Sequence, residues 1–424
     1  MTEAFLHYIW KMKLLKYSAL KTISGEEISI LKTGEHNLDA GPDFLNARIK
    51  IGNTTWAGSV EIHIKSSDWR KHKHSNDPAY DNVILHVVYE NDDEILSKIE
   101  KPIHTVELKG KFDQKLFYNY ERLQNSSSEI PCSTSISGVR EFTIKSWLSR
   151  MLIDRLEEKS SRIETSFTKN KGDWEVTFYH QLARAFGTRL NGDAFQQTAE
   201  TLPLQVLAKN KNNLLILESL LFGCAGWLDG NVKDEYMLKL RKEFLFQQKK
   251  FSLSAIQKQQ WKLLRLRPAN FPTQRLAQFA ALVHQSSHLF SKILNTESVS
   301  SLRKYFKVKS SPYWETHLLP GKNSAEHSTL LTDDFIDLLL INTVIPVVFY
   351  YGKIKDDDAL KNKALNWLDS IPSENNFIIR EWKEAGVKSK SAYDSQALLH
   401  LRKNLCSKKL CLHCGIGHSI LKNI

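Results

Sequence analysis

Alternating and apolar runs near the N-terminus predict three β-strands. Residues 44–51 alternate, with Leu45, Ala47, Ile49 and Ile51 on one face and Asn46, Arg48 and Lys50 on the other. After the turn signal Gly52-Asn53, a second run sets Val60, Ile62 and Ile64 against Glu61, His63 and Lys65. Residues 82–89 are apolar apart from His86, which is typical of a strand buried on both faces. The pattern predicts a hairpin, a polar crossover at 68–80 containing a short helix or loop, and an inner strand.

Shorter signals complete this N-terminal region. Residues 2–17 have the spacing of an amphipathic helix, 26–31 and 103–108 read as strands, and 112–123 begin a helix. The polar stretch 124–129, QNSSSE, is the clearest linker in the chain. We therefore place an α/β domain at residues 1–125.

Helical spacing dominates the rest of the chain. It predicts helices at 142–163, 174–186, 194–202, 214–222, 233–251 and 273–294. Residues 335–351 are strongly apolar but contain Asp337, Asn342 and Pro346, so we expect a core helix and not a membrane span. The predicted class is α+β, with a mixed sheet and flanking helices followed by a larger all-α domain at residues 130–424.

Composition and charge indicate the compartment and the partner. The chain has 424 residues, and the apolar residues near its start are interrupted by His7, Lys11 and Lys13, unlike a signal peptide. Five cysteines without an export signal suggest a reducing cytoplasm. Residues 1–130 hold 17 Lys and Arg against 19 Asp and Glu, whereas the remainder holds 42 against 28. We therefore expect a cytoplasmic protein, not bound to a membrane, whose basic helical domain binds nucleic acid.

The candidate chemistry lies in residues 34–91. Glu61, His63 and Lys65 share one face of a strand because side chains alternate along it. Asp43, at the start of the neighbouring strand, could complete a site for a hard divalent cation, which prefers oxygen ligands. Such a metal can activate water and neutralise charge on a phosphodiester.

The register of the hairpin decides whether these acids meet. A two-residue turn would pair Ile51 with Thr54 and place Asp43 opposite Ile62, away from Glu61. A three-residue turn, or a bulge at Gly58, would shift the register by one residue and bring the acids together. In the alternative, Asp43 caps a turn and the polar side chains of residues 61–65 form an exposed strand face.

Pro42-Asp43 followed by Glu61-x-His63 resembles the PD-(D/E)xK motif of restriction-endonuclease-like nucleases, over roughly residues 1–110. The resemblance implies a restriction-endonuclease-like mixed sheet, with Asp43 and Glu61 binding Mg²⁺ or Mn²⁺. His63 stands where that superfamily has lysine, and Lys65 lies one pleat further along the same face. The whole chain also resembles an uncharacterised bacterial family, a domain of unknown function.

Further acids and histidines are auxiliary candidates. Glu3 is either another acid near the site or a first-turn carboxylate favoured by the helix dipole. His72 and His74 could chelate a metal together with Asp77 on an extended segment, or form a solvated basic loop. His86, inside an apolar strand, is more typical of a core histidine.

The C-terminus carries a cysteine cluster, Cys406-x4-Cys411-x2-Cys414. Thiolates favour zinc or iron–sulfur iron, and a fourth ligand is needed. His418 would complete the site locally, whereas Cys132 would close a four-cysteine site across the chain. Cys224 reads as an ordinary buried thiol.

Arg265, Arg267 and Arg275 flank a rigid proline-containing turn and could contact phosphates, or could cap helices and pair with acids. The sequence thus predicts a metal-dependent nuclease. One alternative is a non-catalytic nucleic-acid-binding or scaffold protein with a degenerate site. A weaker one is a metal hydrolase of another phosphate ester that uses His63, His72, His74 and His86.

Overall fold

The computed structural model describes residues 1–424 except 17–19, 99, 231–232 and 423–424. The chain forms two compact units. The first contains Met1–Leu148, Arg380–Val387 and Leu401–Ile424, and the second contains Ser149–Ile379 and Lys388–His400. The expected junction after residue 125 therefore lies inside the first unit, which also includes the C-terminal cysteines.

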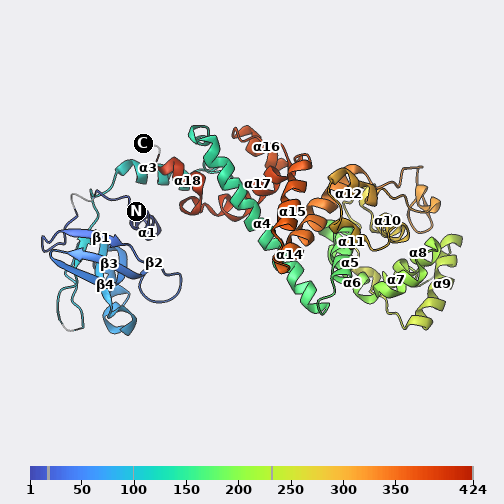
Figure 1. Cartoon of the computed structure of the whole chain (residues 1–424), viewed down its shortest axis with the longest axis horizontal. Coiled ribbons are helices and arrows are strands. Elements are labelled where there is room, and N and C mark those ends of the chain that lie inside the picture. The colour runs from blue at the N-terminus through green and yellow to red at the C-terminus, as the bar shows by residue number, and fades with distance from the viewer. Residues whose placement is uncertain (17–19, 99, 231–232, 423–424) are drawn as a thin grey trace. The chain divides into compact units, whose positions relative to one another are not determined.

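The first unit contains a mixed sheet (Figure 1). Its strands are β1 (Ile28–Lys32), β2 (Glu35–His36), β3 (Phe44–Ile51), β4 (Thr54–Lys65), β5 (Val83–Glu90) and β6 (Thr105–Glu107). The order is β1-β3-β4-β5-β6, and β2 pairs with β3. β1, β3 and β4 are antiparallel neighbours, whereas β4, β5 and β6 run parallel. The predicted hairpin, crossover and inner strand are confirmed, as is the mixed α+β class.

Burial explains why β4 and β5 are inner strands. Leu85, Val87 and Val88 of β5 are fully buried, as expected for a strand covered on both faces. Helix α1 (Glu3–Lys11) packs against β4. The Thr2 side chain caps α1 by accepting a hydrogen bond from the Phe5 N–H. The helix is shorter than the predicted 2–17 and is followed by Lys13 at φ 52°, a left-handed conformation incompatible with helix; Tyr17 lies outside the described residues.

A bulge in β3 sets the register of the hairpin. Ile51 pairs with Thr54 across the two-residue turn, but the pairing shifts by one residue between Ala47 and Phe44. Asn46 lies at φ 56° within this shift. The bulge rotates Leu45, expected on the apolar face, to 37% exposure. The register shift that brings the two acids together therefore occurs in β3, not at Gly58 or in the turn.

The crossover between β4 and β5 is short and anchored by one side chain. It contains α2 (Asp68–Lys71) and two 3₁₀ turns, His74–Asn76 and Pro78–Tyr80. Trp69 is 2% exposed, and its indole Nε1 donates a hydrogen bond to Ser75 Oγ at 3.0 Å. This packing holds the polar segment against the sheet.

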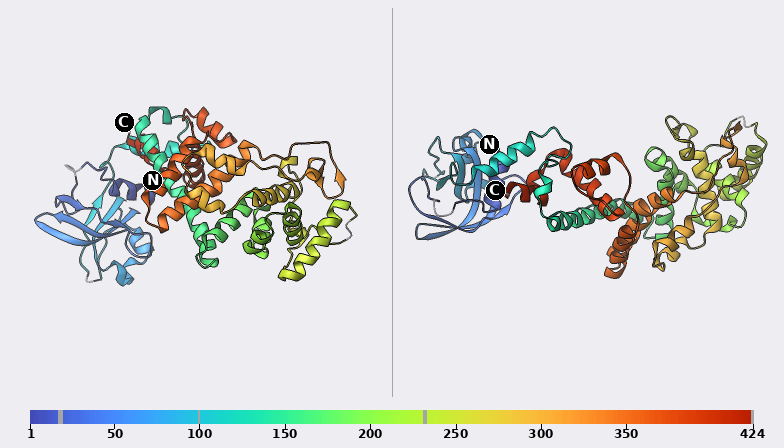
Figure 2. Two further views of the ribbon diagram at one scale, coloured as in Figure 1. Left: turned by 45° about the vertical axis from the view of Figure 1, so that its right-hand side comes forward. Right: turned by 90° about the horizontal axis from the view of Figure 1, so that it is seen from above.

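The remaining described elements are mainly helices, which Figure 2 shows in two further views. They are α3 (Gln114–Gln124), α4 (Glu141–Lys169), α5 (Trp174–Phe186), α6 (Thr188–Thr201), α7 (Leu204–Asn210), α8 (Leu214–Cys224), α9 (Glu235–Phe251), α10 (Pro272–Gln285), α11 (Leu289–Leu294), α12 (Val299–Phe306), α13 (Asp333–Leu339), α14 (Ile345–Ile354), α15 (Asp358–Ser370), α16 (Phe377–Glu384), α17 (Ala392–Asn404) and α18 (Gly415–Lys422). The predicted helix at 273–294 is divided into α10 and α11, because His288 adopts φ 50°. β7 (His317–Leu319) and β8 (Lys322–Asn323) form a two-stranded sheet.

One continuous helical stretch, Asp333–Ile354, is long and apolar enough to cross a membrane by length and composition alone. It joins α13 and α14 through a π-helical turn, Leu340–Val344. However, 78% of its apolar window is buried inside the fold. That burial agrees with the core helix expected from the sequence.

A substitution of Gly58 tests the packing of β4 against β5. A Cβ atom at this position would lie 2.5 Å from Ile84 Cγ2 and 2.6 Å from the Asn82 carbonyl oxygen. Gly58→Ala should therefore lower the free energy of unfolding by about 1–3 kcal/mol. Thermal denaturation measures the change, with Gly138→Ala as the control because a Cβ there meets nothing within 4 Å. Equal melting temperatures for the two variants would contradict the packing.

Candidate active site

Two acidic side chains meet across the β3–β4 hairpin. The Asp43 N–H donates to Glu61 Oε2 at 3.1 Å, and the Ile62 N–H donates to Asp43 Oδ2 at 2.9 Å. Glu61 is 5% exposed and His63 is 2% exposed. The exposed strand face considered from the sequence is therefore wrong for these two residues, and the bulge in β3 is what aligns the acids.

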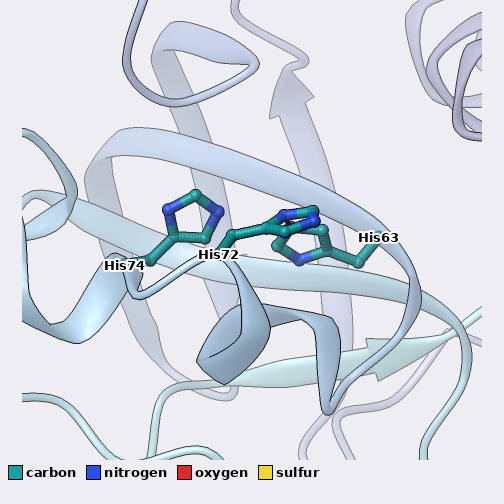
Figure 3. A group of neighbouring side chains, drawn as sticks. All are labelled: His63, His72 and His74. Carbon is teal, nitrogen blue, oxygen red and sulfur yellow. Dashed lines mark hydrogen bonds between the residues drawn. The ribbon is translucent and has the colours of Figure 1, made fainter.

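Histidines from the strand and the crossover surround Glu61. His63 Nε2 and His74 Nε2 lie 3.4 Å and 3.3 Å from Glu61 Oε1. His63 Nε2 also shares a hydrogen bond with His72 Nδ1 at 3.1 Å. One ligand atom from each of the three imidazoles lies within 4.8 Å of the other two, and Figure 3 shows the rings gathered in one place. We use "histidine–carboxylate cluster" for Asp43, Glu61, His63, His72 and His74.

Helix α1 adds two groups to this cluster. His7 Nε2 lies 3.2 Å from Asp43 Oδ2. The half-buried Glu3 has a pKa raised by burial and then by the Asp43 charge, while His7 and His72 act in the opposite direction. Glu3 therefore faces the same site. His7 was missed by sequence reasoning, although its spacing of four residues from Glu3 on an amphipathic helix is a usable signal.

Two further side chains, His86 and Tyr80, contact histidines of the cluster. His86 is fully buried in β5, and its Nε2 shares a hydrogen bond with His63 Nδ1 at 2.9 Å. The second nitrogen of His63 is thereby oriented toward the cluster. The Tyr80 ring stacks on His74 with centroids 3.8 Å apart. No sequence signal distinguishes Tyr80 from other tyrosines.

Two other predicted site residues have different surroundings. Lys65 is exposed, and its Nζ lies 3.8 Å from Asp92 Oδ2, so its ammonium pairs with an acid at the end of β5. Asp77 Oδ1 accepts a hydrogen bond from the Ala79 N–H at 2.9 Å and caps a 3₁₀ turn. Asp77 still lies near enough to His74 to influence it electrostatically.

The three arginines of the proline-containing turn are not equivalent. Arg265 and Arg267 are exposed. Arg275 is 5% exposed, stacks over the Phe335 ring and donates to Asn270 Oδ1 at 2.8 Å. Burial lowers its pKa to about 9. The structure contradicts a phosphate contact by Arg275, because its guanidinium is used inside the core.

Burial strongly perturbs the cluster's proton equilibria. Burial, followed by the Asp43 charge, raises the pKa of Glu61 to about 8. Burial and the neighbouring histidines lower the pKa of His63 to about 4. Burial lowers the pKa of His86 to about 3. Burial thus disfavours the anionic form of Glu61 and the cationic forms of His63 and His86. A bound metal cation would favour the anionic carboxylate and the neutral imidazoles.

Two buried imidazole nitrogens fit the same interpretation. His7 Nε2 lies 3.2 Å from Asp43 Oδ2 and His74 Nε2 lies 3.3 Å from Glu61 Oε1, but neither contact has hydrogen-bond geometry. Buried polar atoms are normally satisfied, so such atoms require an explanation. Imidazole nitrogens and carboxylate oxygens are the donor set of Zn²⁺ and Mn²⁺ sites. His63, His72 and His74 could hold such an ion, and Glu61 Oε1 lies within 3.4 Å of the His63 and His74 nitrogens.

The cysteines form a second group in the first unit. Cys132, Cys406, Cys411 and Cys414 are each 8% exposed and unbridged. Burial raises the pKa of Cys132 to about 12, and Cys414 and Cys411 contribute in the same direction. The charges of the C-terminal thiols therefore reach Cys132, but among the described residues the group of three or more ligand atoms within 4.8 Å of one another is His63, His72 and His74. His418, the alternative fourth ligand, shares a hydrogen bond between its Nδ1 and Tyr8 Oη at 2.5 Å.

Comparison with known proteins identifies one family. A family model described as "Protein of unknown function (DUF2851)" matches residues 3–377. No curated protein and no solved structure matches the chain.

The raised pKa of Glu61 predicts how the stability of the metal-free protein changes with pH. The Glu61 carboxyl binds its proton more tightly in the folded protein than in the unfolded chain. The free energy of unfolding of the wild type therefore decreases as pH rises from about 4.5 to about 8. Glu61→Gln imitates the protonated form and does not titrate. With chelator present, its melting temperature relative to wild type should therefore increase across this range.

Glu35→Gln is the matched control, since Glu35 is exposed and its pKa is lowered by Lys32. Its difference from wild type should not increase with pH. A difference for Glu61→Gln that is constant or falls with pH would contradict the burial of the Glu61 carboxyl beside Asp43.

Proposed function

The chain belongs to the DUF2851 family, and for this member we propose a metal-dependent phosphodiesterase activity on nucleic acid. The reaction takes place at the histidine–carboxylate cluster. The observation that carries the proposal is that Glu61 contacts the Asp43 N–H and two imidazoles, and that donor atoms of three imidazoles lie within 4.8 Å of one another. Such convergence of buried ionisable groups is characteristic of functional sites.

The positions of the acids support a nuclease-like arrangement. Asp43 precedes β3 and Glu61 lies within β4, so the two residues that resemble the PD-(D/E)xK acids are side by side in adjacent strands. Glu3 approaches them from the N-terminal helix. On this basis we assign the sheet of the first unit to the restriction-endonuclease-like class.

His63 gives the site a different metal preference from that of a lysine-containing nuclease. Its imidazole lies among His72, His74 and Glu61, where a lysine would place an additional positive charge. Imidazole ligands suit Mn²⁺ and Zn²⁺, whereas Mg²⁺ prefers oxygen ligands and bound water. The proposal therefore makes Mn²⁺ or Zn²⁺ the cofactor, with Mg²⁺ a weaker substitute.

The metal would activate a water molecule and neutralise charge on the scissile phosphodiester. The chain's own residues position these components. Glu61 and Asp43 fix each other through the backbone N–H groups of Asp43 and Ile62. His86 holds the His63 ring in place. Glu3 keeps its proton to a higher pH than an ordinary carboxyl, so it can exchange a proton with a group that enters the site.

Charge supports a polyanionic substrate. Residues 131–424 contain 42 Lys and Arg against 28 Asp and Glu. The second unit also contains a pocket of about 340 Å³ to which Lys159, Arg162, Arg184 and Arg189 contribute, with no carboxylate among its described lining residues. Arg184 already pairs with Asp193, and burial lowers the pKa of Lys159, so Arg162 and Arg189 are the cations that could contact a phosphate group. The pocket supports nucleic acid as the substrate class more strongly than the buried Arg275 does.

The test is cleavage of labelled single-stranded DNA, double-stranded DNA and RNA by the full chain. Chelated protein should be inactive and should regain activity with Mn²⁺ or Zn²⁺. Asp43→Asn and His74→Ala should each lower the cleavage rate by about a hundredfold or more, because each removes a group at the metal position. Glu35→Gln, which changes an exposed acid of the same sheet, should keep wild-type activity.

Two results would count against this activity. Equal cleavage by wild type and Asp43→Asn would trace the activity to another site or to a contaminant. Binding of nucleic acid without cleavage under any of the three metals would favour the non-catalytic alternative, in which the His63 substitution has produced a degenerate site.

A further inference from the structure

The pocket of about 340 Å³ in the second unit has the properties of a site for one small anionic group. Residues of α4, α5, α6, α13 and the π-helical turn Leu340–Val344 form its walls. Its described lining residues include four cations and no carboxylate. The volume is near the lower end for ligand sites in proteins, so the pocket suits a small molecule or the end of a chain and not a length of duplex.

Lys159, one of the four cations, is used by the backbone of the π-helical turn. The Ile345 N–H donates to the Leu340 carbonyl oxygen, five residues earlier. Pro346 has no N–H with which to continue this pattern, so the Ile341 carbonyl oxygen lacks that donor. Lys159 Nζ donates to the Ile341 carbonyl oxygen at 3.2 Å. Its ammonium therefore satisfies the fold and is not available to a ligand.

Two of the three arginines at the pocket have no anionic partner. Arg184 pairs with Asp193. Arg162 of α4 and Arg189 of α6 form no ion pair and no side-chain hydrogen bond within the part of the chain that the structure describes. A guanidinium presents its N–H donors in a planar fork that matches the oxygens of a phosphate. Two positive charges that the protein leaves unneutralised therefore lie at one pocket.

Two buried polar side chains of the pocket also lack a partner. Gln181 is 8% exposed and Thr343 is 5% exposed, and both line the pocket. Neither side chain forms a hydrogen bond to any residue that the structure describes. Buried polar groups are normally hydrogen-bonded, so an amide and a hydroxyl left unpaired beside a cavity indicate a polar ligand. Both groups can donate to an anionic oxygen.

Helix α6 begins at the pocket. Its first residues, Thr188 and Arg189, line the wall, and no side chain caps its N-terminus. The N–H groups in the first turn of a helix have no carbonyl partner within the helix, and the helix dipole favours an anion beside them. Thr188 adopts φ 54°, a costly conformation for a β-branched residue that is found mainly at functional sites.

We propose that this pocket is a binding site for a phosphomonoester group. Arg162 and Arg189 pair with the phosphate oxygens. The Gln181 amide, the Thr343 hydroxyl and the first N–H groups of α6 donate to the same oxygens. A phosphomonoester carries roughly −1.5 to −2 charges at neutral pH, which matches two free guanidinium groups better than the single charge of a phosphodiester does.

The phosphomonoester can belong to a small phosphorylated molecule or to the end of a nucleic acid, and it is bound without being cleaved. The site goes beyond the proposed phosphodiesterase activity, since none of its residues belongs to the histidine–carboxylate cluster.

The experiment is isothermal titration calorimetry of the full chain, freed of metal so that no ligand is cleaved. The ligands are adenosine monophosphate, its cyclic phosphodiester and adenosine. We expect the monoester to bind at least about tenfold more tightly than the other two, because it alone carries the second charge. Arg162→Gln combined with Arg189→Gln should abolish this preference. Gln181→Glu, which places an anion in the pocket, should weaken monoester binding by about tenfold or more.

A second pair of ligands identifies the source of the group. It consists of a short single-stranded DNA with a terminal phosphate and the same DNA with a terminal hydroxyl. Tighter binding of the phosphorylated DNA than of adenosine monophosphate assigns the site to a nucleic-acid end, and equal binding assigns it to a small molecule. Either result supports the proposal, provided that the double arginine variant loses the preference for the monoester.

The matched control is Lys242→Gln combined with Lys249→Gln. It removes two exposed charges from α9, which belongs to the same unit but contributes nothing to the pocket. Its affinity for the monoester should stay within about twofold of wild type, because the lost charges do not contact the ligand. Both double variants should keep the wild-type melting temperature, since Arg162 and Arg189 are also exposed. If Gln181→Glu does not fold, the double arginine variant decides the outcome.

The proposal is overturned if the monoester and the cyclic diester bind equally, or if the double arginine variant keeps the preference. It is also overturned if the lysine control loses as much affinity as the arginine variant, because net charge alone would then explain the binding. None of these results depends on whether the chain cleaves nucleic acid, so failure here is distinguishable from failure of the proposed activity.

Discussion

The burial of Glu61 beside Asp43 is the constraint on which the N-terminal site depends. Burial removes the Glu61 carboxyl from water and the neighbouring Asp43 charge disfavours a second anion, which is why the pKa of Glu61 rises to about 8. The bulge at Asn46 imposes this proximity by aligning β3 with β4. The surrounding imidazoles lie close enough to share a cation with the acids. The proposed metal ion would offset the neighbouring acids and bind buried imidazole nitrogens whose contacts with Asp43 and Glu61 lack hydrogen-bond geometry.

The sequence was sufficient for the elements that depend on local patterns. The hairpin, the buried inner strand and most of the helices follow from periodicity, because burial imposes a repeat of two or of about 3.6 residues. The position of the β3 bulge was not predictable, since Leu45-Asn46 carries no glycine or proline signal. The exposure of Leu45 and the alignment of the acids follow from this bulge, so they could not be predicted from the sequence either.

Other differences arose where a side chain's role depends on distant residues. Arg275 reads as a surface arginine in a basic turn, but the Phe335 ring and polar neighbours accommodate it in the core. Lys65 has the parity of Glu61, yet Asp92 at the end of the parallel strand attracts its ammonium. Cys132 and the C-terminal cysteines belong to one compact unit because the last segment of the chain returns to the first unit. Local periodicity contains no information about such a return.

The donor set of the histidine–carboxylate cluster decides which metal it would select. Carboxylates and imidazoles suit Mn²⁺ or Zn²⁺. The exposed His72 leaves this cluster open to a reactant, as a catalytic metal site requires.

The most direct test of the central claim is an anomalous difference map, measured at the manganese absorption edge, from crystals of the full chain soaked in Mn²⁺. The account predicts one peak at about 2.2 Å from Glu61 and the imidazole nitrogens of the cluster. It also predicts that the peak disappears in Asp43→Asn or becomes much weaker. A map without density there, in crystals where His63 and Glu61 keep the contacts described above, would contradict the account.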